Sequence, residues 1–292
     1  MGNLLKGRVA VVTGAGNGIG RAEAIELASQ GASVVVNDIG TSPDGTGFSR
    51  GPADAVVNQI VTAGGSAVAS YESVTSEKGA ETIIRTAMAS YGRLDVLVNN
   101  AGVVKDPQDI SEIKTEDWEI QIKTHLFGTF YCTRAASGVM KKQGYGRIIN
   151  TASHTGLGWK GFAPYSAAKE GIIGFTRTVA RDVAEFGVTC NAIRPVAAWR
   201  GTKENIPRVA VNRPEDVAAL VVYLASEEAG DINGCIFEVW RGHVGIFVEP
   251  PPVQQVIRKD GSWTPEELAK TLPQSLTRGR SRTQFPNILN LD

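Results

Sequence analysis

The chain has 292 residues, of which 42% are hydrophobic and 21% are charged, proportions typical of a soluble globular protein. Its 30 basic residues balance its 30 acidic residues, so the net charge favours neither nucleic acid nor an anionic membrane as a partner. No apolar run reaches the ~18 residues that a membrane span needs. Cys132, Cys190 and Cys235 are widely spaced and belong to no Cys/His cluster, which predicts buried thiols in a reducing compartment and no metal site.

The amino-terminal stretch MGNLLKGRVAVVTG leads directly into the first predicted strand without a long apolar leader, so we expect a cytoplasmic protein. Five apolar runs rich in valine and isoleucine then alternate with helix-length segments, and residues 66–71 and 235–240 would complete seven strands. Continuous runs of this kind fit strands that are buried on both faces of a parallel sheet. We therefore predict an α/β fold, a doubly wound seven-stranded parallel sheet of the Rossmann type. The strands are expected at 8–14, 32–38, 66–71, 94–102, 146–153, 187–195 and 235–240.

Helical periodicity predicts helices between these strands, at 18–30, 52–63, 76–91, 115–142, 164–186 and 214–226. Residues 39–52 contain four glycines and two prolines, which predicts a long loop. From Glu249 onwards the composition becomes basic and proline-containing. We therefore divide the chain into a dinucleotide-binding and catalytic domain at 1–248 and a C-terminal extension at 249–292.

The first predicted strand ends in TGAGNGIG, residues 13–20, a glycine-rich turn. Glycines at a strand-to-helix turn let the backbone approach a pyrophosphate, and the free N–H groups of the helix stabilise its charge. The strict GxGxxG pattern is not met, because Ile19 occupies its last glycine position. The pattern present is TGxxxGxG, through Gly14, Gly18 and Gly20. A tight turn without a ligand is the alternative for this motif taken alone.

Asp38 ends the second predicted strand, 24 residues after Gly14, where an acid is expected to meet the adenosine ribose hydroxyls. Its carboxylate would repel a 2′-phosphate, and the neighbouring Asn17 and Ile39 offer no cation to hold one. The sequence therefore favours NAD over NADP as the cofactor. The alternative for Asp38 is a structural cap at the end of the strand.

The stretch PYSAAKEG, residues 164–171, places Tyr165 and Lys169 four positions apart at the start of a predicted helix. Side chains at this spacing share a face, so the ammonium group would favour the phenolate. One lysine cannot bring a phenol with a pKa of ~10 near neutrality, whereas a second positive charge in a desolvated pocket can. An oxidised nicotinamide would be such a charge. Taken alone, the same spacing also arises by chance.

Four motifs occur in a fixed order along the chain: TGAGNGIG, NNAG at 99–102, Ser153, and YSAAK at 165–169. Together they resemble the short-chain dehydrogenase/reductase superfamily over residues 5–245. The resemblance implies a Rossmann domain, a supporting role for Asn100 beside the cofactor strand, and Ser153, Tyr165 and Lys169 as catalytic residues. It also implies a set of cofactor-binding residues: Gly14, Asn17, Gly18, Ile19, Gly20, Asp38, Val74, Asn100, Ala101, Gly102, Tyr165, Lys169 and Pro195.

A narrower resemblance rests on VVVNDIG with the glycine-rich insertion after it, HLFGTFYCTRAA, YGRIINTASHTG and NGCIFEVWRGHVG. These stretches are similar to the (3R)-hydroxyacyl-CoA dehydrogenase part of the type 2 multifunctional enzymes of β-oxidation. In most of the superfamily an asparagine that helps to relay protons stands where this chain has His125, and the resemblance implies a catalytic role for His125. Two departures bear on the substrate pocket. Ser153 and Tyr165 are separated by 11 residues, one fewer than is common, and Pro195-Val196 replaces the usual Pro-Gly.

The loop after the sixth predicted strand is basic, with Arg200, Lys203, Arg208 and Arg213, and Arg194 lies just before it. These side chains either meet the phosphates of coenzyme A or are solvated loop charges. Three aromatic residues, Trp159, Phe162 and Trp199, either form an apolar wall of the substrate pocket or pack in the core. We expect His154 and His243 to be structural or surface residues.

The sequence as a whole predicts an NAD-dependent oxidoreductase that acts on a secondary alcohol/ketone pair, (3R)-hydroxyacyl-CoA and 3-ketoacyl-CoA. The alternatives are the same chemistry on a free steroid, cyclic or other secondary alcohol, and a non-catalytic dinucleotide-binding module. The superfamily resemblance further implies a homodimer or homotetramer formed through the helices at 115–142 and 164–186. Neither nucleic acid nor a membrane is expected as a partner.

Overall fold

The computed structural model describes residues 2–198, 212–248 and 250–279. By its internal contacts the chain divides into two units, Met1–Phe247 and Val248–Asp292. Within the described residues, none of the helices combines the length and the apolarity that crossing a bilayer requires.

The first unit is built on one eight-stranded sheet with the strand order β3-β2-β1-β4-β5-β6-β7-β8. Its parallel strands are β1 (Val9–Thr13), β2 (Ser33–Asn37), β3 (Ser66–Ser70), β4 (Val96–Asn99), β5 (Gly146–Thr151), β6 (Val188–Pro195) and β7 (Ile236–Trp240). These are the seven strands that the sequence predicts, and the α/β fold with a mostly parallel sheet is confirmed. Every residue of the central strands β1, β4 and β5 is buried, as expected for strands covered on both faces.

The eighth strand, β8 (His243–Ile246), was not predicted from the sequence. It pairs antiparallel with β7 through a tight hairpin, with Trp240 opposite His243. Its residues alternate between half-buried and exposed, so this edge strand has no continuous apolar run. A run of four residues that contains a glycine and a histidine gives too weak a pattern to identify a strand.

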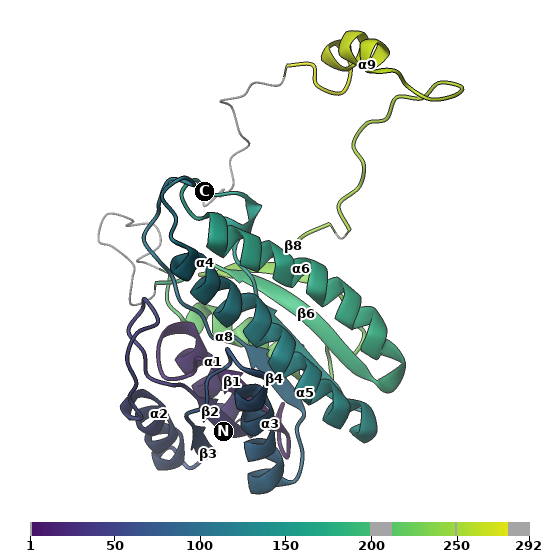
Figure 1. The fold of residues 1–292 in the computed structure, drawn as a ribbon. Coiled ribbons are helices and arrows are strands. Elements are labelled where there is room, and N and C mark those ends of the chain that lie inside the picture. The colour runs from purple at the N-terminus through teal and green to yellow at the C-terminus, as the bar shows by residue number, and fades with distance from the viewer. Residues whose placement is uncertain (1, 199–211, 249, 280–292) are drawn as a thin grey trace. The chain divides into compact units, whose positions relative to one another are not determined.

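Helices cover both faces of the sheet (Figure 1). One face packs against α1 (Gly18–Ser29), α2 (Gly51–Thr62) and α8 (Glu215–Ala225), and the other against α3 (Glu77–Tyr91), α5 (Gly128–Gln143) and α6 (Ala163–Val183). Each face therefore has its own hydrophobic core. The core beneath α1 includes Leu27 and Val36, and the core beneath α5 includes Met140 and Ile148.

The helix predicted at 115–142 is interrupted. It consists of α4 (Thr115–Ile122), a π-helical turn at Lys123–Phe127, and α5. Single π turns inside α-helices occur frequently at functional sites. Here the wider turn contains His125, one of the predicted catalytic residues.

The second unit contains one short helix, α9 (Pro265–Thr271), within the part that is described. Thr264 and Glu267 form a capping box at its start, in which each side chain accepts a hydrogen bond from the backbone of the other residue. Lys259 forms an ion pair with Glu267 and lies over the ring of Trp263.

Candidate active site

The predicted site residues follow the carboxyl ends of parallel strands. β1 lies between β2 and β4, so the strand order reverses beside it, and ligands of doubly wound folds bind at such a switch point. The glycine-rich turn follows β1, Asp38 follows β2, and the Asn100–Gly102 segment follows β4. Ser153 comes two residues after β5, and Pro195 ends β6. All of these residues therefore lie at the same edge of the sheet, the one formed by the carboxyl ends of the parallel strands.

The turn after β1 leaves no room for larger side chains. Gly14 and Gly18 have φ values of 65° and 54°, in the left-handed region that glycine adopts readily. A Cβ on Gly14 would lie 2.8 Å from the Cα of Ala101, and a Cβ on Gly20 would fall on the side-chain amide of Asn100. The backbone of this turn is thus held close to the segment after β4.

Asn100 joins the two segments by hydrogen bonds. Its Nδ2 donates to the carbonyl oxygens of Thr13 at 2.9 Å and Gly14 at 3.1 Å, and its backbone N–H donates to the Thr13 hydroxyl. Asn100 therefore holds the start of the segment after β4 against the glycine-rich turn. Nearby, the Nδ2 of Asn17 is buried and has no hydrogen-bond partner, and Ile19 is half-buried.

Asp38 is almost buried, and both of its carboxylate oxygens are engaged by the backbone. Oδ2 accepts a hydrogen bond from Gly16 N–H at 2.8 Å, and Oδ1 accepts one from Gly40 N–H at 2.6 Å. The carboxylate therefore closes the loop after β2 against the glycine-rich turn, the structural role that the sequence left open. Because each carboxylate oxygen can accept a second hydrogen bond, this capping role leaves acceptor sites for ribose hydroxyls.

Ser153, Tyr165 and Lys169 come together between β5 and α6. Tyr165 and Lys169 lie in the first turns of α6, with the Lys169 Nζ 5.5 Å from the centre of the Tyr165 ring. The Ser153 hydroxyl is close enough to the Tyr165 phenol to lower its pKa, and it accepts a hydrogen bond from Thr155 N–H at 3.1 Å. Lys169 is buried and donates to the Thr151 carbonyl oxygen at 2.6 Å.

The pKa values of Tyr165 and Lys169 do not shift as expected for a lysine that stabilises a neighbouring phenolate. Burial raises the pKa of the Tyr165 phenol above its ordinary value, and only the hydrogen bond from Ser153 acts in the opposite direction. Burial also lowers the pKa of Lys169 to about 7, because an ammonium group is costly to desolvate. In the chain alone, the lysine therefore does not lower the pKa of the tyrosine, and a further positive charge is needed for that.

His125 lies beside Tyr165, with ring centroids 4.9 Å apart and the rings nearly perpendicular. Its Nε2 is 2.6 Å from the Val103 carbonyl oxygen and 3.2 Å from the Val103 N–H, so Nε2 is engaged by the backbone of Val103 in either tautomer. Nδ1 is buried and has no hydrogen-bond partner. Burial, together with the nearby Lys169, holds the pKa of His125 well below its usual value, so the imidazole is neutral. Gly102 makes this placement feasible, because a Cβ there would lie 3.0 Å from Nδ1.

The other two predicted cofactor residues lie at the same edge. Val74 is buried in the loop after β3, where a Cβ on Gly128 would lie 2.8 Å from its Cγ2. Pro195 is half-buried at the end of β6. Among the residues that the structure describes, His, Cys, Asp and Glu side chains form no cluster that could hold a metal ion.

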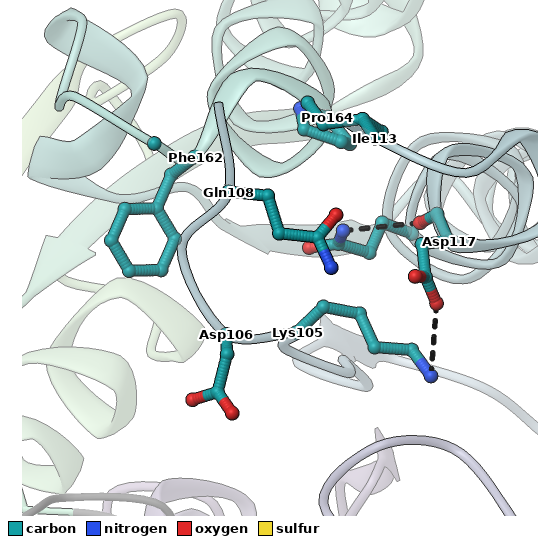
Figure 2. A pocket seen from close by; sticks show the side chains of 9 residues that line it. Lys105, Asp106, Gln108, Ile113, Asp117, Phe162 and Pro164 are labelled. Carbon is teal, nitrogen blue, oxygen red and sulfur yellow. Dashed lines mark hydrogen bonds and ion pairs between the residues drawn. The ribbon is translucent and has the colours of Figure 1, made fainter. Parts of the chain in front are cut away.

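A small cavity lies next to the start of α6, and Phe162 is one of its walls (Figure 2). Its volume is about 10 Å³, enough for a single water molecule and far too small for a substrate. Lys105 and Asp117 form an ion pair of 3.2 Å at its side. Of the other aromatic residues predicted to line a substrate pocket, Trp159 is exposed, and Trp199 lies outside the described residues.

The predicted coenzyme A cluster is wrong in one of its members. Arg194 is only 2% exposed, and its guanidinium binds the Ser153 carbonyl oxygen and the Glu170 carboxylate, so it cannot reach a phosphate in solvent. A lone arginine within the apolar run GVTCNAIRP was the sequence signal for this buried role. Arg213 is exposed and paired with Asp216. The other members, Arg200, Lys203 and Arg208, lie outside the described residues.

Comparisons with known proteins agree with this geometry. The family profile described as short chain dehydrogenase matches residues 8–201. The peroxisomal hydratase-dehydrogenase-epimerase of Neurospora crassa is 43% identical over 283 residues, an alignment that covers 96% of this chain and 31% of that protein. The peroxisomal multifunctional enzyme type 2 of Mus musculus is 44% identical over 266 residues, covering 90% of this chain and 36% of that protein. This chain thus spans about a third of the length of these relatives.

Among solved structures, the crystal structure of a short chain dehydrogenase from Mycobacterium avium matches with a TM-score of 0.84 and 41% sequence identity. The match covers 96% of this chain and 98% of the other. The likeness therefore includes nearly the whole length of both chains.

Proposed function

The chain belongs to the short-chain dehydrogenase family, and from this premise we propose that it is an NAD-dependent dehydrogenase of (3R)-hydroxyacyl-CoA thioesters. As a family member it is an oxidoreductase that acts on CH–OH groups. The observation that supports the reaction best is the convergence of Ser153, Tyr165 and Lys169 at the switch-point edge of the sheet.

The residues at this edge fit a dinucleotide. The crowded turn at Gly14 and Gly20 lets the backbone approach a pyrophosphate, and the unpartnered Asn17 amide supplies a buried donor. Asp38 is the reason to propose NAD rather than NADP, because its carboxylate would accept ribose hydroxyls and repel a 2′-phosphate. When bound, the nicotinamide would supply the hydride acceptor and donor, chemistry that no side chain provides.

The side chains would transfer the proton and orient the substrate, each in a different role. Tyr165 exchanges the proton of the alcohol oxygen as a general acid and base. Ser153 holds that oxygen next to the phenol by a hydrogen bond. Lys169 places a positive charge on the same face of α6. His125 is proposed as a relay residue, and because its Nε2 is engaged by the backbone of Val103, the ring would exchange a proton through the unpartnered Nδ1.

The substrate class rests on the relatives, of which one is named a hydratase-dehydrogenase-epimerase and the other a multifunctional enzyme type 2. The alternatives are a free steroid, cyclic or other secondary alcohol, and a non-catalytic dinucleotide-binding module. The experiment is NADH consumption with acetoacetyl-CoA and a longer 3-ketoacyl-CoA, beside free cyclic and steroid ketones, repeated with NADPH. We expect turnover of the thioesters with NADH alone. Activity only on a free ketone would contradict the thioester assignment and leave the dehydrogenase assignment intact.

A second variant separates an enzyme from a binding module. Tyr165→Phe keeps the ring and removes the proton donor, so we expect turnover to be lost while NADH still binds, as measured by its fluorescence. An unchanged turnover number in Tyr165→Phe would contradict the catalytic assignment.

We also propose that the protein is a homodimer or homotetramer. Exposed aromatic side chains support this proposal: Phe127 is 42% exposed, Phe130 37% and Trp118 39%, all on the segment from α4 to α5. Phe130 also contacts Phe175 of α6, so the aromatic surface is continuous between the two helices. Light scattering that shows only a monomer would contradict this proposal. A cytoplasmic location likewise stays a prediction, since both relatives are peroxisomal by name.

A further inference from the structure

Arg194 is the largest of the fully buried side chains, and it is charged. It lies one residue before the end of β6, where the neighbouring Ile193 is apolar and equally buried. A buried guanidinium is costly unless it is paired and hydrogen-bonded. If this position served packing alone, an apolar residue of similar volume would fill it without that cost. The contacts of Arg194 therefore indicate what it is for.

Those contacts converge on the catalytic serine. Arg194 Nη1 donates to the carbonyl oxygen of Ser153 at 2.6 Å, and Nη2 donates to the Glu170 carboxylate at 2.9 Å. The guanidinium also lies 5.1 Å from the centre of the Phe247 ring, and its Nε is buried without a hydrogen-bond partner. Glu170 is the residue after Lys169 on α6. One planar group thus ties the backbone of Ser153 to the helix that carries Tyr165 and Lys169.

The residue after Ser153 is held separately, from β7. His154 is 4% exposed, and its Nε2 lies 2.9 Å from the Glu238 carboxylate. The Nε2 of His243, on β8, forms a hydrogen bond with the same carboxylate at 2.8 Å. Ser153 and His154 are therefore anchored from two neighbouring strands. Of these anchors, only Arg194 binds the serine itself.

We propose that Arg194 is a positioning residue, which fixes the distance between the Ser153 hydroxyl and the Tyr165 phenol by binding the Ser153 carbonyl and Glu170 at once. The inference rests on the dehydrogenase activity proposed above. Lys169 and Ser166 of α6 bind the carbonyl oxygens of Thr151 and Thr155, on either side of Ser153. Arg194 adds the link at Ser153 itself, and without it the serine backbone is free to shift between these two anchors and to move the hydroxyl out of line with the phenol. A displacement of about 1 Å in a catalytic group can reduce the rate on the order of 10²-fold.

The test compares Arg194→Met with a matched control, Arg147→Met. Arg147 is also a buried arginine on a neighbouring strand, 5% exposed, and it also binds backbone carbonyls, those of Ser226, Gly146 and Gly187. It is the second residue of β5 and so lies at the amino end of the sheet, away from the site. Both variants lose the same kind of contact. Only Arg194→Met loses one that holds Ser153.

For Arg194→Met we expect kcat for acetoacetyl-CoA reduction to fall on the order of 10²-fold, with an unchanged NADH dissociation constant. We also expect the pH midpoint of kcat for oxidation of (3R)-hydroxybutyryl-CoA to move upwards, because the Ser153 hydrogen bond is what lowers the pKa of Tyr165. Arg194→Lys, which can still bond one partner, should recover part of kcat. Arg147→Met should keep kcat per folded molecule and the same pH midpoint.

Glu170→Ala provides a second variant, because the Glu170 side chain is 46% exposed. Its kcat is also taken per folded molecule, because the variant leaves the buried Arg194 guanidinium without its ion pair. It should lower kcat and raise the pH midpoint in the same direction as Arg194→Met. An unchanged kcat and midpoint in both Arg194→Met and Glu170→Ala, or equal losses in Arg194→Met and Arg147→Met, would overturn the inference. An inactive Tyr165→Phe beside a fully active Arg194→Met refutes the inference alone. An active Tyr165→Phe refutes the proposed function and the inference together.

Discussion

Replacing Lys169 with methionine should abolish turnover and at the same time stabilise the fold near neutral pH. Burial lowers the pKa of Lys169 from 10.5 to about 7. Below pH 7 the folded protein therefore contains a buried ammonium group, and the cost of burying this charge lowers the free energy of unfolding. A difference of about 3.5 units at 1.36 kcal/mol each is about 5 kcal/mol. Methionine removes this cost, and it also removes the charged hydrogen bond to the Thr151 carbonyl, worth about 1.5–3 kcal/mol. The net gain at acidic pH is therefore about 2–3 kcal/mol.

The sign of this effect depends on pH. Between pH 7 and 10.5 the unfolded wild-type chain binds a proton that the folded chain does not, so wild-type stability rises with pH across this window. The gain in the free energy of unfolding of Lys169→Met over wild type should be largest below pH 7 and should decrease between pH 7 and 10.5. Above pH 10.5 the variant should be the less stable protein, because only the loss of the hydrogen bond to Thr151 remains. Urea unfolding of both proteins at about pH 6, 8 and 10 measures the difference directly.

Lys142→Met is the matched control, because Lys142 is exposed at the end of α5 and its removal should change stability by less than about 0.5 kcal/mol at any pH. If Lys169→Met were less stable than wild type at about pH 6, or if the difference between the two did not shrink as the pH rose, the buried-charge reasoning would be wrong.

Three further predictions concern the dinucleotide turn and the assembly. Gly20→Ala should abolish NADH binding, because its Cβ would fall on the Asn100 amide, whereas Gly174→Ala, with no atom within 4 Å of its Cβ, should leave binding unchanged in a fluorescence titration. Asp38→Ala should lower the ratio of kcat/KM for NADH to that for NADPH by about 10-fold or more. The substitution removes the charge that repels a 2′-phosphate and frees the Gly16 and Gly40 amides to bind one. An unchanged ratio would contradict the role assigned to Asp38. Phe130→Glu should give a smaller species in light scattering, while Phe48→Glu, on the loop after β2, should not; an unchanged mass for Phe130→Glu would place the interface elsewhere.

The sequence predicted the parts of this fold that depend on local patterns. Apolar runs identified five of the seven parallel strands, β1, β2, β4, β5 and β6, because a strand buried on both faces carries a continuous apolar signal. The edge strand β8 gave no such signal, since half of its residues face solvent. The π turn at His125 was missed for a different reason. It depends on the tertiary fit of the imidazole against Val103 and Gly102, not on the propensities of its own residues.

Arg194 shows the limit of reading charge from sequence. Because it lies near other basic residues, Arg194 was expected either to meet the phosphates of coenzyme A or to be a solvated loop charge, yet the structure buries it. The sequence does not show that Glu170, on α6, and the Ser153 carbonyl, after β5, converge on its guanidinium. Such a partnership joins residues 24 and 41 positions apart, and only the fold brings them together. The neighbouring apolar residues were the better guide.

The free energies of the Tyr165–Lys169 pair explain why a dinucleotide has to complete this site. With the tyrosine pKa raised above its ordinary value and the lysine pKa lowered to about 7, the neutral pair is favoured over phenolate and ammonium. A unit positive charge about 4 Å from the phenolate, at an effective dielectric constant of about 20, is worth about 4 kcal/mol. The positive charge of an oxidised nicotinamide would therefore strongly favour the phenolate. On this reasoning the general base exists only in the cofactor complex, so the pKa of the phenol, followed by its ultraviolet absorbance, should fall when NAD binds and stay high with NADH.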